Sequence, residues 1–290
     1  MEELTLKAAD GLQLAVAVSG PDNPAALVQI IHGAVEHKER YYKFMEYLKE
    51  QGFTAIISDN RGHGASVNEE YPLGHMDGYE QIIEDQLVVS RYMKSRCPGK
   101  KLHLFGHSFG SLLARAYIQK YDNEIGKLVL SGTVNYIPAV PAGMAIGKLC
   151  LVCSGKYGVS KLLNTMGRNG KNDSWVSANE DNLKTYRADP LCQYPYTNSA
   201  VMTMFGAVKN LHDYKKYQCK NKNMLILSVT GEGDPVTGGP KGLADTVRTL
   251  ERAGYKNITN KVYPGMKHEV LNEREFMMVY RDIAEFLRLG

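Results

Sequence analysis

A serine stands at a tight corner of the chain, between Gly106 and Gly110. The apolar run 102–105 ends at the first of these glycines, and a helical pattern begins beyond Ser108. The pattern G-x-S-x-G between a strand and a helix exposes a serine hydroxyl above the edge of a sheet. It also directs the N–H of Phe109 toward the atom that the hydroxyl would attack. We therefore predict that Ser108 is a nucleophile; the alternative is a serine that only caps the helix.

A serine hydroxyl is a weak nucleophile, so it needs a base and a group that orients the base. His268 follows the last predicted strand, in the run PGMKHEVLNE. Asp234 follows the strand before it, in the glycine-rich run TGEGDPVTGG, where Glu232 is the rival acid. The order Ser108, Asp234, His268 along the chain, each at the end of a strand, predicts a catalytic triad.

The chain also offers a second N–H donor for a negatively charged intermediate. His32, Gly33 and Ala34 follow the predicted strand 27–31, and the glycine lets the N–H of Ala34 face the site beside that of Phe109. The eight histidines show neither HExxH nor cysteine–histidine spacing, so we expect no metal. The side chain of His107 is expected to pack away from the serine hydroxyl.

Short apolar runs and helical patterns alternate along most of the chain. This alternation predicts an α/β fold with a mostly parallel sheet, helices on both faces, and the active site at the carboxyl ends of the strands. A hairpin signal, Asp10-Gly11, lies between the first two runs. Strands are predicted at 4–7, 12–18, 27–31, 54–58, 101–105, 127–130, 224–229 and 260–263, and helices at 41–51, 79–97, 111–121, 242–253 and 273–289.

The alternation breaks between residues 135 and 217. This stretch has four prolines and no clear strand, and residues 125–172 contain no acidic side chain. Four apolar residues follow the spacing of an amphipathic helix: Val159, Leu162, Leu163 and Met166. We predict a helical cap over 135–217, inserted into a core formed by 1–134 and 218–290.

Charge and cysteine content exclude several classes of protein. The net charge of +4 is spread among mixed acids and bases, so we expect no nucleic-acid partner. The number of cysteines is odd, and the pair Cys150 and Cys153 has no second pair at zinc spacing. We interpret the cysteines as reduced core thiols. The N-terminus shows no signal-peptide pattern, and no apolar run reaches the ~20 residues of a membrane span, so we expect a cytoplasmic protein.

Six segments resemble the serine α/β-hydrolases of the monoacylglycerol lipase and lysophospholipase group, also called the serine aminopeptidase S33 type. They are HGAVEHKERY at 32–41, DNRGHGAS at 59–66, GHSFG at 106–110, DPLCQYPYT at 189–197, GEGDPV at 231–236 and YPGMKHEVLNE at 263–273. The resemblance covers nearly the whole chain. It implies an α/β-hydrolase fold with an eight-stranded sheet, the triad Ser108, Asp234 and His268, and Ala34 and Phe109 as oxyanion-hole donors.

The resemblance also implies the activity: hydrolysis of the carboxylic ester of a single-chain acyl lipid through an acyl-enzyme on Ser108, without a cofactor. A small-ester carboxylesterase, an aminopeptidase-type hydrolase and a non-catalytic binding protein remain as alternatives. The cap would cover an acyl tunnel. Because its first half is apolar and basic, peripheral contact with an anionic membrane is an additional hypothesis. The sequence does not indicate an oligomeric state.

Two charged residues in the first segment, Glu36 and Arg40, become candidates for contact with a polar head group. The alternative is a structural ion pair that holds the oxyanion loop. Val35 stands where such lipases often have glycine, which restricts the freedom of this loop. The residues of the second segment, Asp59, Arg61 and His63, are interpreted as loop scaffolding.

Overall fold

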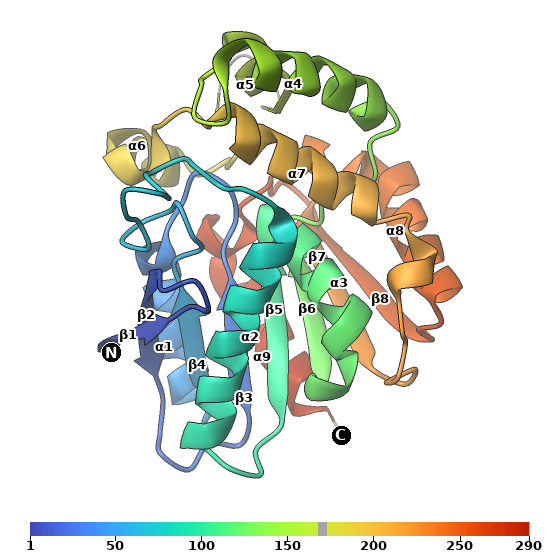
Figure 1. The fold of residues 1–290 in the computed structure, drawn as a ribbon. Coiled ribbons are helices and arrows are strands. Elements are labelled where there is room, and N and C mark those ends of the chain that lie inside the picture. The colour runs from blue at the N-terminus through green and yellow to red at the C-terminus, as the bar shows by residue number, and fades with distance from the viewer. Residues whose placement is uncertain (168–172, 290) are drawn as a thin grey trace.

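A computed structural model describes residues 1–167 and 173–289; residues 168–172, within the predicted cap, lie outside the described residues. In the described chain one sheet of eight strands has the order β1-β2-β4-β3-β5-β6-β7-β8 (Figure 1). The first two pairs in this order are antiparallel and all the others are parallel. The strands are β1 (Glu2–Lys7), β2 (Gln13–Ser19), β3 (Leu27–Ile31), β4 (Thr54–Ser58), β5 (Leu102–His107), β6 (Lys127–Ser131), β7 (Leu225–Gly231) and β8 (Asn257–Tyr263).

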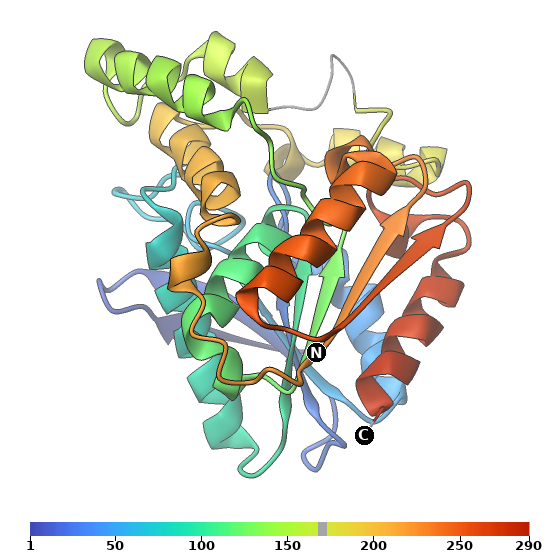
Figure 2. The ribbon, with the colours of Figure 1, turned by 90° about the vertical axis from the view of Figure 1, so that its right-hand side faces the viewer.

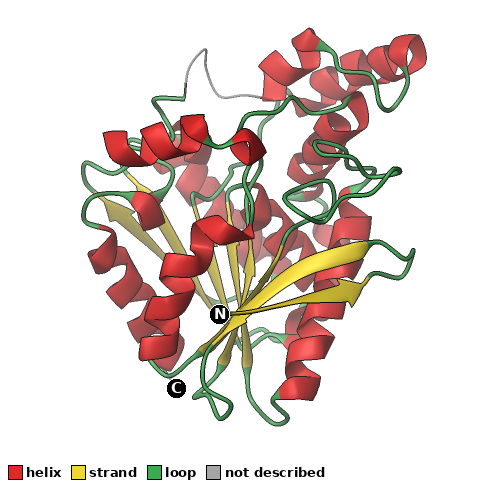
Figure 3. Ribbon diagram, turned by 90° about the vertical axis from the view of Figure 1, so that its left-hand side faces the viewer, coloured by secondary structure: helices red, strands yellow, loops and turns green. Residues whose placement is uncertain are grey.

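Helices cover both faces of the twisted sheet, as Figure 3 shows from the side. Helices α1 (Tyr42–Glu50) and α9 (Phe276–Arg288) pack on one face, where the rings of Phe44 and Tyr280 lie 4.8 Å apart. Helices α2 (Tyr79–Arg96), α3 (Phe109–Tyr121) and α8 (Gly239–Ala253) cover the other face. The central parallel strands are buried on both sides, which explains their continuous apolar runs. The α/β prediction is confirmed.

The C-terminal helix begins at Phe276, three residues later than predicted. The residue at the predicted start, Glu273, is buried and its carboxylate accepts hydrogen bonds from the N–H groups of Lys267 (2.9 Å) and Ala178 (2.8 Å). A short 3-10 turn, Val270–Asn272, precedes it. Glu273 therefore anchors the loop that carries His268 instead of extending the helix.

Four helices lie across the carboxyl edge of the sheet, with α4 and α5 outermost (Figures 1 and 2). They are α4 (Val140–Ser154), α5 (Lys161–Gly167), α6 (Glu180–Ala188) and α7 (Asn198–Asn210). The predicted amphipathic stripe is only partly correct. Helix α5 begins after Val159, and only Leu163 of the stripe is buried, whereas Leu162 is 56% exposed. Helix α5 packs against α7 and α4, and the other apolar side chains of the predicted stripe stay exposed.

Cysteine burial differs from the prediction at two positions. Cys97, Cys192 and Cys219 are buried free thiols, but Cys150 is half-buried and Cys153 is exposed on α4. None of the helices in the described residues combines the length and apolar run that a bilayer span requires.

Candidate active site

Ser108 directly follows β5 and stands at the N-cap position of α3 with φ 52° and ψ −118°, but its side chain makes no capping hydrogen bond. A non-glycine residue in this region carries strain of about 1–3 kcal/mol, which the surrounding structure must enforce. The neighbouring glycines permit the corner because backbone passes too close for a side chain. A Cβ at Gly106 would lie 2.3 Å from the carbonyl oxygen of Gly110, and one at Gly110 would lie 2.1 Å from that of Ile31. The N–H of Ser108 is tied to β6 by a 2.9 Å bond to the carbonyl of Ser131.

The two other predicted triad residues are hydrogen-bonded to each other. Nδ1 of His268 lies 2.9 Å from Oδ2 of Asp234, and both side chains are buried. The second carboxylate oxygen of Asp234 accepts the N–H of Val236 at 2.9 Å, which fixes the carboxylate plane. Because a carboxylate accepts the Nδ1 proton, the neutral imidazole keeps Nε2 unprotonated. This is the tautomer that a general base requires.

Burial and charge act in opposite directions on this pair. Burial favours the neutral form of each group, but the opposite charge of the partner and the hydrogen bond between them prevail. The pKa of Asp234 is therefore held below its ordinary value, although burial alone would raise it. The pKa of His268 lies above its ordinary value, although burial alone would lower it.

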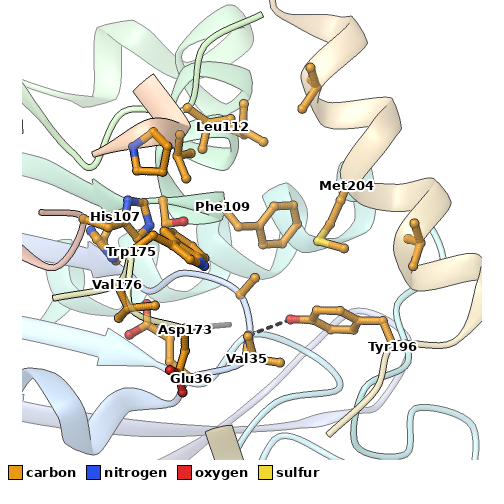
Figure 4. Close-up of a pocket in the computed structure, with 18 of the residues that line it drawn as sticks. Val35, Glu36, His107, Phe109, Leu112, Asp173, Trp175, Val176, Tyr196 and Met204 are labelled. Carbon is orange, nitrogen blue, oxygen red and sulfur yellow. Dashed lines mark hydrogen bonds between the residues drawn. The ribbon is translucent and has the colours of Figure 1, made fainter. Parts of the chain in front are cut away.

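Ser108, His268, Ala34 and Phe109 line one cavity of about 750 Å³ beneath the four outer helices. Figure 4 shows part of its wall, with Phe109 labelled. Asp234 does not line it and stands behind His268. The ring of Trp175, which the sequence analysis did not single out, packs 4.9 Å from the imidazole. Much of the remaining wall is apolar: Leu112, Val134, Val140, Met166, Val201, Met204, Phe205 and Val208.

The predicted oxyanion donors sit on two different elements beside this cavity. Phe109 is the first residue of α3, so its N–H has no acceptor within the helix. The N–H of Gly33 is taken by the Glu36 carboxylate, whereas within the described residues no acceptor pairs with the N–H of Ala34. These two free N–H groups can together bind a developing oxyanion.

Glu36 and Arg40 form an ion pair at 3.5 Å, and a carboxylate that the sequence analysis did not consider completes the group. Arg40 also contacts Glu269 at 2.5 Å, and Asn182 of α6 donates to the same carboxylate at 2.7 Å. Burial and the nearby Glu269 charge raise the pKa of Glu36 to about 7, against the opposing effect of Arg40. The sequence signal that could have indicated Glu269 as a site residue is its position next to His268.

These contacts match the structural ion pair that the sequence analysis gave as one alternative. Glu36 receives the N–H of Gly33 and the hydroxyl of Tyr41 (2.8 Å), so it supports the oxyanion loop. Glu36 also lines the cavity, whereas Arg40 lies behind it between the two carboxylates. Contact of either residue with a head group stays a prediction.

His107 packs its ring 4.8 Å from that of His268, and its Nδ1 lies 3.2 Å from the hydroxyl of Ser131. Burial lowers the pKa of His107 to about 3, so this imidazole stays neutral. These contacts fit the packing role expected from the sequence, but His107 also lines the cavity that contains Ser108, so it does not lie away from the site.

One group among the described residues has the ligand types and spacing for a metal ion. Ligand atoms of His37, Asp189 and Cys192 lie within 4.8 Å of one another. However, both ring nitrogens of His37 face carboxylates, those of Asp189 (2.7 Å) and Glu39. Burial alone would lower its pKa, but hydrogen bonds that the ring makes to Cys192 and to the two carboxylates raise it to about 11. The imidazolium therefore supplies the positive charge in this cluster.

The model of the family described as serine aminopeptidase, S33 (Hydrolase_4), matches residues 22–275. The chain belongs to this family. The membership confirms the resemblance drawn from the six sequence segments.

Individual relatives match over nearly the whole chain. A monoacylglycerol lipase of Mycolicibacterium smegmatis is 25% identical over 281 residues, covering 96% of this chain and 93% of its own. Phospholipase YtpA of Bacillus subtilis is 27% identical, covering 91% and 96%. The crystal structure of a Paleococcus ferrophilus monoacylglycerol lipase superimposes with a TM-score of 0.74 at 26% identity, covering 94% and 98%.

The raised pKa of His268 predicts the acid side of the pH profile. Because the base must be neutral, kcat/KM for an ester should fall as the pH drops through a midpoint above the ordinary ~6.5 of imidazole. The measurement is kcat/KM against pH with a soluble ester. The Glu36→Gln variant should show the same fall of kcat/KM at low pH. If the fall disappears in this variant, the titrating group is Glu36.

Proposed function

We propose that this S33-family hydrolase cleaves carboxylic esters of single-chain acyl lipids, as a monoacylglycerol lipase or a lysophospholipase. The observation that supports this most strongly is the position of Ser108 and His268, with Asp234 behind the imidazole, at the wall of a largely apolar 750 Å³ cavity. That volume lies in the ~300–1,000 Å³ range of small-molecule sites. The relatives named monoacylglycerol lipase and phospholipase agree with it.

In the proposed mechanism, Nε2 of His268 takes the proton of the Ser108 hydroxyl as its oxygen attacks the ester carbonyl carbon. The N–H groups of Ala34 and Phe109 bind the negatively charged oxygen of the tetrahedral intermediate. The imidazolium, stabilised by Asp234, then gives its proton to the leaving alcohol. Water attacks the acyl-enzyme by the same route and releases the fatty acid.

An aminopeptidase would need a free carboxylate to bind the substrate's amine. Glu36 and Asp173, which both line the cavity, are already paired with Arg40 and Arg187. Glu269, also at the wall, pairs with Arg40 as well. Arg40 balances one of the two carboxylates, and the pKa of Glu36, raised to about 7, reduces the negative charge of the other. The small remaining charge favours an acyl lipid ester over a peptide with a free N-terminus.

A substrate series tests the proposed function. Monoacylglycerols and lysophospholipids of increasing acyl length should give a kcat/KM that rises with the apolar area placed in the cavity, by up to about tenfold for two methylenes. Short aryl esters should be slower, and aminoacyl arylamides should be hydrolysed at or near background. Faster turnover of the arylamides than of any lipid ester would contradict the proposal.

We further propose that residues 135–217 act as a lid that rests on an anionic membrane surface. Large apolar side chains are exposed on its outer helices, with Leu149 at 64% and Val152 at 84% on α4. Lys148 and Lys161 lie among them, and no described acid forms an ion pair with either. Lys156, by contrast, pairs with Asp77 at 3.1 Å, so its charge is partly balanced and attracts an anionic surface less strongly. Apolar area flanked by free cations suits an anionic lipid interface.

Vesicle binding tests this lid proposal. Lys148→Glu/Lys161→Glu should lose salt-sensitive binding to vesicles that contain anionic lipid, since each Lys contributes about 1 kcal/mol there. Lys222→Glu/Lys256→Glu is the matched control, because these exposed lysines precede β7 and β8 at the opposite edge of the sheet. All proteins should hydrolyse a soluble short ester equally. Equal vesicle binding by both double variants would contradict membrane contact.

A further inference from the structure

The turn that carries Ala34 contains a strained residue. Val35 has φ 48°, one of three positive-φ positions outside glycine among the described residues. A β-branched side chain rarely occupies this region. Such a conformation persists only where neighbouring groups enforce it, so the contacts of Val35 show what holds the turn.

The N–H of Val35 donates a hydrogen bond of 2.7 Å to the hydroxyl of Tyr196, which lies 161 residues further along the chain (Figure 4). Tyr196 precedes α7, is 5% exposed and lines the cavity. Its backbone is itself fixed, because the side-chain amide of Asn164 on α5 accepts its N–H at 2.9 Å and donates to its carbonyl at 2.8 Å. The hydroxyl thus reaches the turn from a fixed position.

A third group orients this hydroxyl. Nε2 of His63 lies 2.7 Å from the Tyr196 hydroxyl, and Nδ1 of His63 lies 3.1 Å from the carbonyl oxygen of Arg61. A carbonyl only accepts, so Nδ1 carries the proton and Nε2 accepts the hydrogen of the hydroxyl. Burial and the nearby ring of His32 lower the pKa of His63 to about 3, so the acceptor stays neutral. The oxygen lone pairs of Tyr196 are therefore free to receive the N–H of Val35.

We propose that Tyr196 is a positioning residue that holds the oxyanion loop by fixing Val35 in its strained conformation. The proposal rests on the proposed function, since it concerns how the N–H of Ala34 is aimed. Without the hydroxyl, Val35 relaxes toward negative φ and the Ala34–Val35 peptide rotates. Ala34 shifts with it, so the Gly33–Ala34 peptide turns its N–H away from the site. Glycine at position 35 carries no such strain, so a loop with glycine needs no such restraint.

The test is a double-mutant cycle with Tyr196→Phe in the natural chain and in a Val35→Gly background. With a soluble short ester, Tyr196→Phe should lower kcat about 100-fold in the natural chain, the size of losing one oxyanion donor, and leave KM within about threefold. In the Val35→Gly background the same change should lower kcat by less than about threefold. The rate of Ser108 labelling by a fluorophosphonate should follow kcat.

Tyr117→Phe is the matched control. It removes a buried tyrosine hydroxyl that lies 2.9 Å from the Ser90 hydroxyl, outside the cavity, and should keep the natural kcat. If Tyr196→Phe fails to fold, His63→Leu asks the same question, because it removes the group that orients the hydroxyl. Thermal unfolding midpoints identify variants that lose activity because their folded state is destabilised.

The possible outcomes distinguish a failure of this proposal from a failure of the proposed function on which it rests. An equal loss of kcat in both backgrounds would make Tyr196 a structural residue only, and no loss in the natural chain would remove any positioning role. If the natural enzyme neither hydrolyses esters nor is labelled at Ser108, the proposed function itself fails, whatever Tyr196 does.

Discussion

Replacing Ser108 by alanine should abolish ester hydrolysis while the protein still folds. The loss of kcat should reach several orders of magnitude, up to about 10⁶, because no other group near His268 can form the acyl-enzyme. The hydroxyl makes no hydrogen bond that supports the fold among the described residues, and alanine fits the same space. The measurement combines steady-state turnover with the thermal unfolding midpoint.

Covalent labelling supplies the control for Ser108→Ala. A fluorophosphonate should modify the natural protein at Ser108 and leave the alanine variant unlabelled. Ser111, the next serine along α3, is fully buried and points to a different set of partners, so Ser111→Ala should label at the natural rate. A label on any other serine would show that Ser108 had been assigned wrongly.

The second large effect is expected at the acid. Asp234→Asn should lower kcat by about 10⁴, because an amide cannot stabilise the imidazolium and lets His268 adopt the wrong tautomer. The geometry supports this magnitude, since the 2.9 Å bond between Asp234 and Nδ1 of His268 is buried on both sides. The measurement is kcat with the soluble ester used for Ser108→Ala.

Glu232→Gln is the matched control for the acid. Glu232 lies two residues earlier in the same turn, but it is exposed and, within the described part of the chain, makes no hydrogen bond or ion pair with His268, so its loss should leave kcat within about twofold. A larger loss for Glu232→Gln than for Asp234→Asn would reverse the assignment of the acid.

Much of this site could be predicted from the sequence because its signals are local. The G-x-S-x-G corner lies between a strand and a helix, and backbone atoms pass so close to its two glycines that no side chain would fit there. The acid and the base follow β7 and β8, and parallel strands bring their carboxyl ends to one edge of the sheet. Residue type, spacing and strand order are therefore enough to place Ser108, Asp234 and His268 at that edge.

Helix boundaries in the outer layer were harder to predict from the sequence, for a physical reason. An apolar spacing in the sequence predicts a helix, but it does not state which neighbour will cover its apolar face. In the structure α5 starts at Lys161 and buries only Leu163 of the expected stripe. Likewise, Glu273 has the propensity to begin a helix, yet its carboxylate accepts the N–H of Lys267 in the His268 loop and the N–H of Ala178, which precedes α6.

By itself the sequence determined the α/β class, the alternating elements and the order of the nucleophile, acid and base, because each follows from patterns within a few residues. Only the tertiary structure decided that Arg40 pairs with Glu269 across 229 positions and that Tyr196 holds Val35 across 161. Such contacts join segments that the fold places together, and neither partner carries a local pattern that names the other. From the sequence, Val35 could be interpreted only as a residue that restricts its loop. The tertiary structure places the Tyr196 hydroxyl, which its strained conformation requires, beside it.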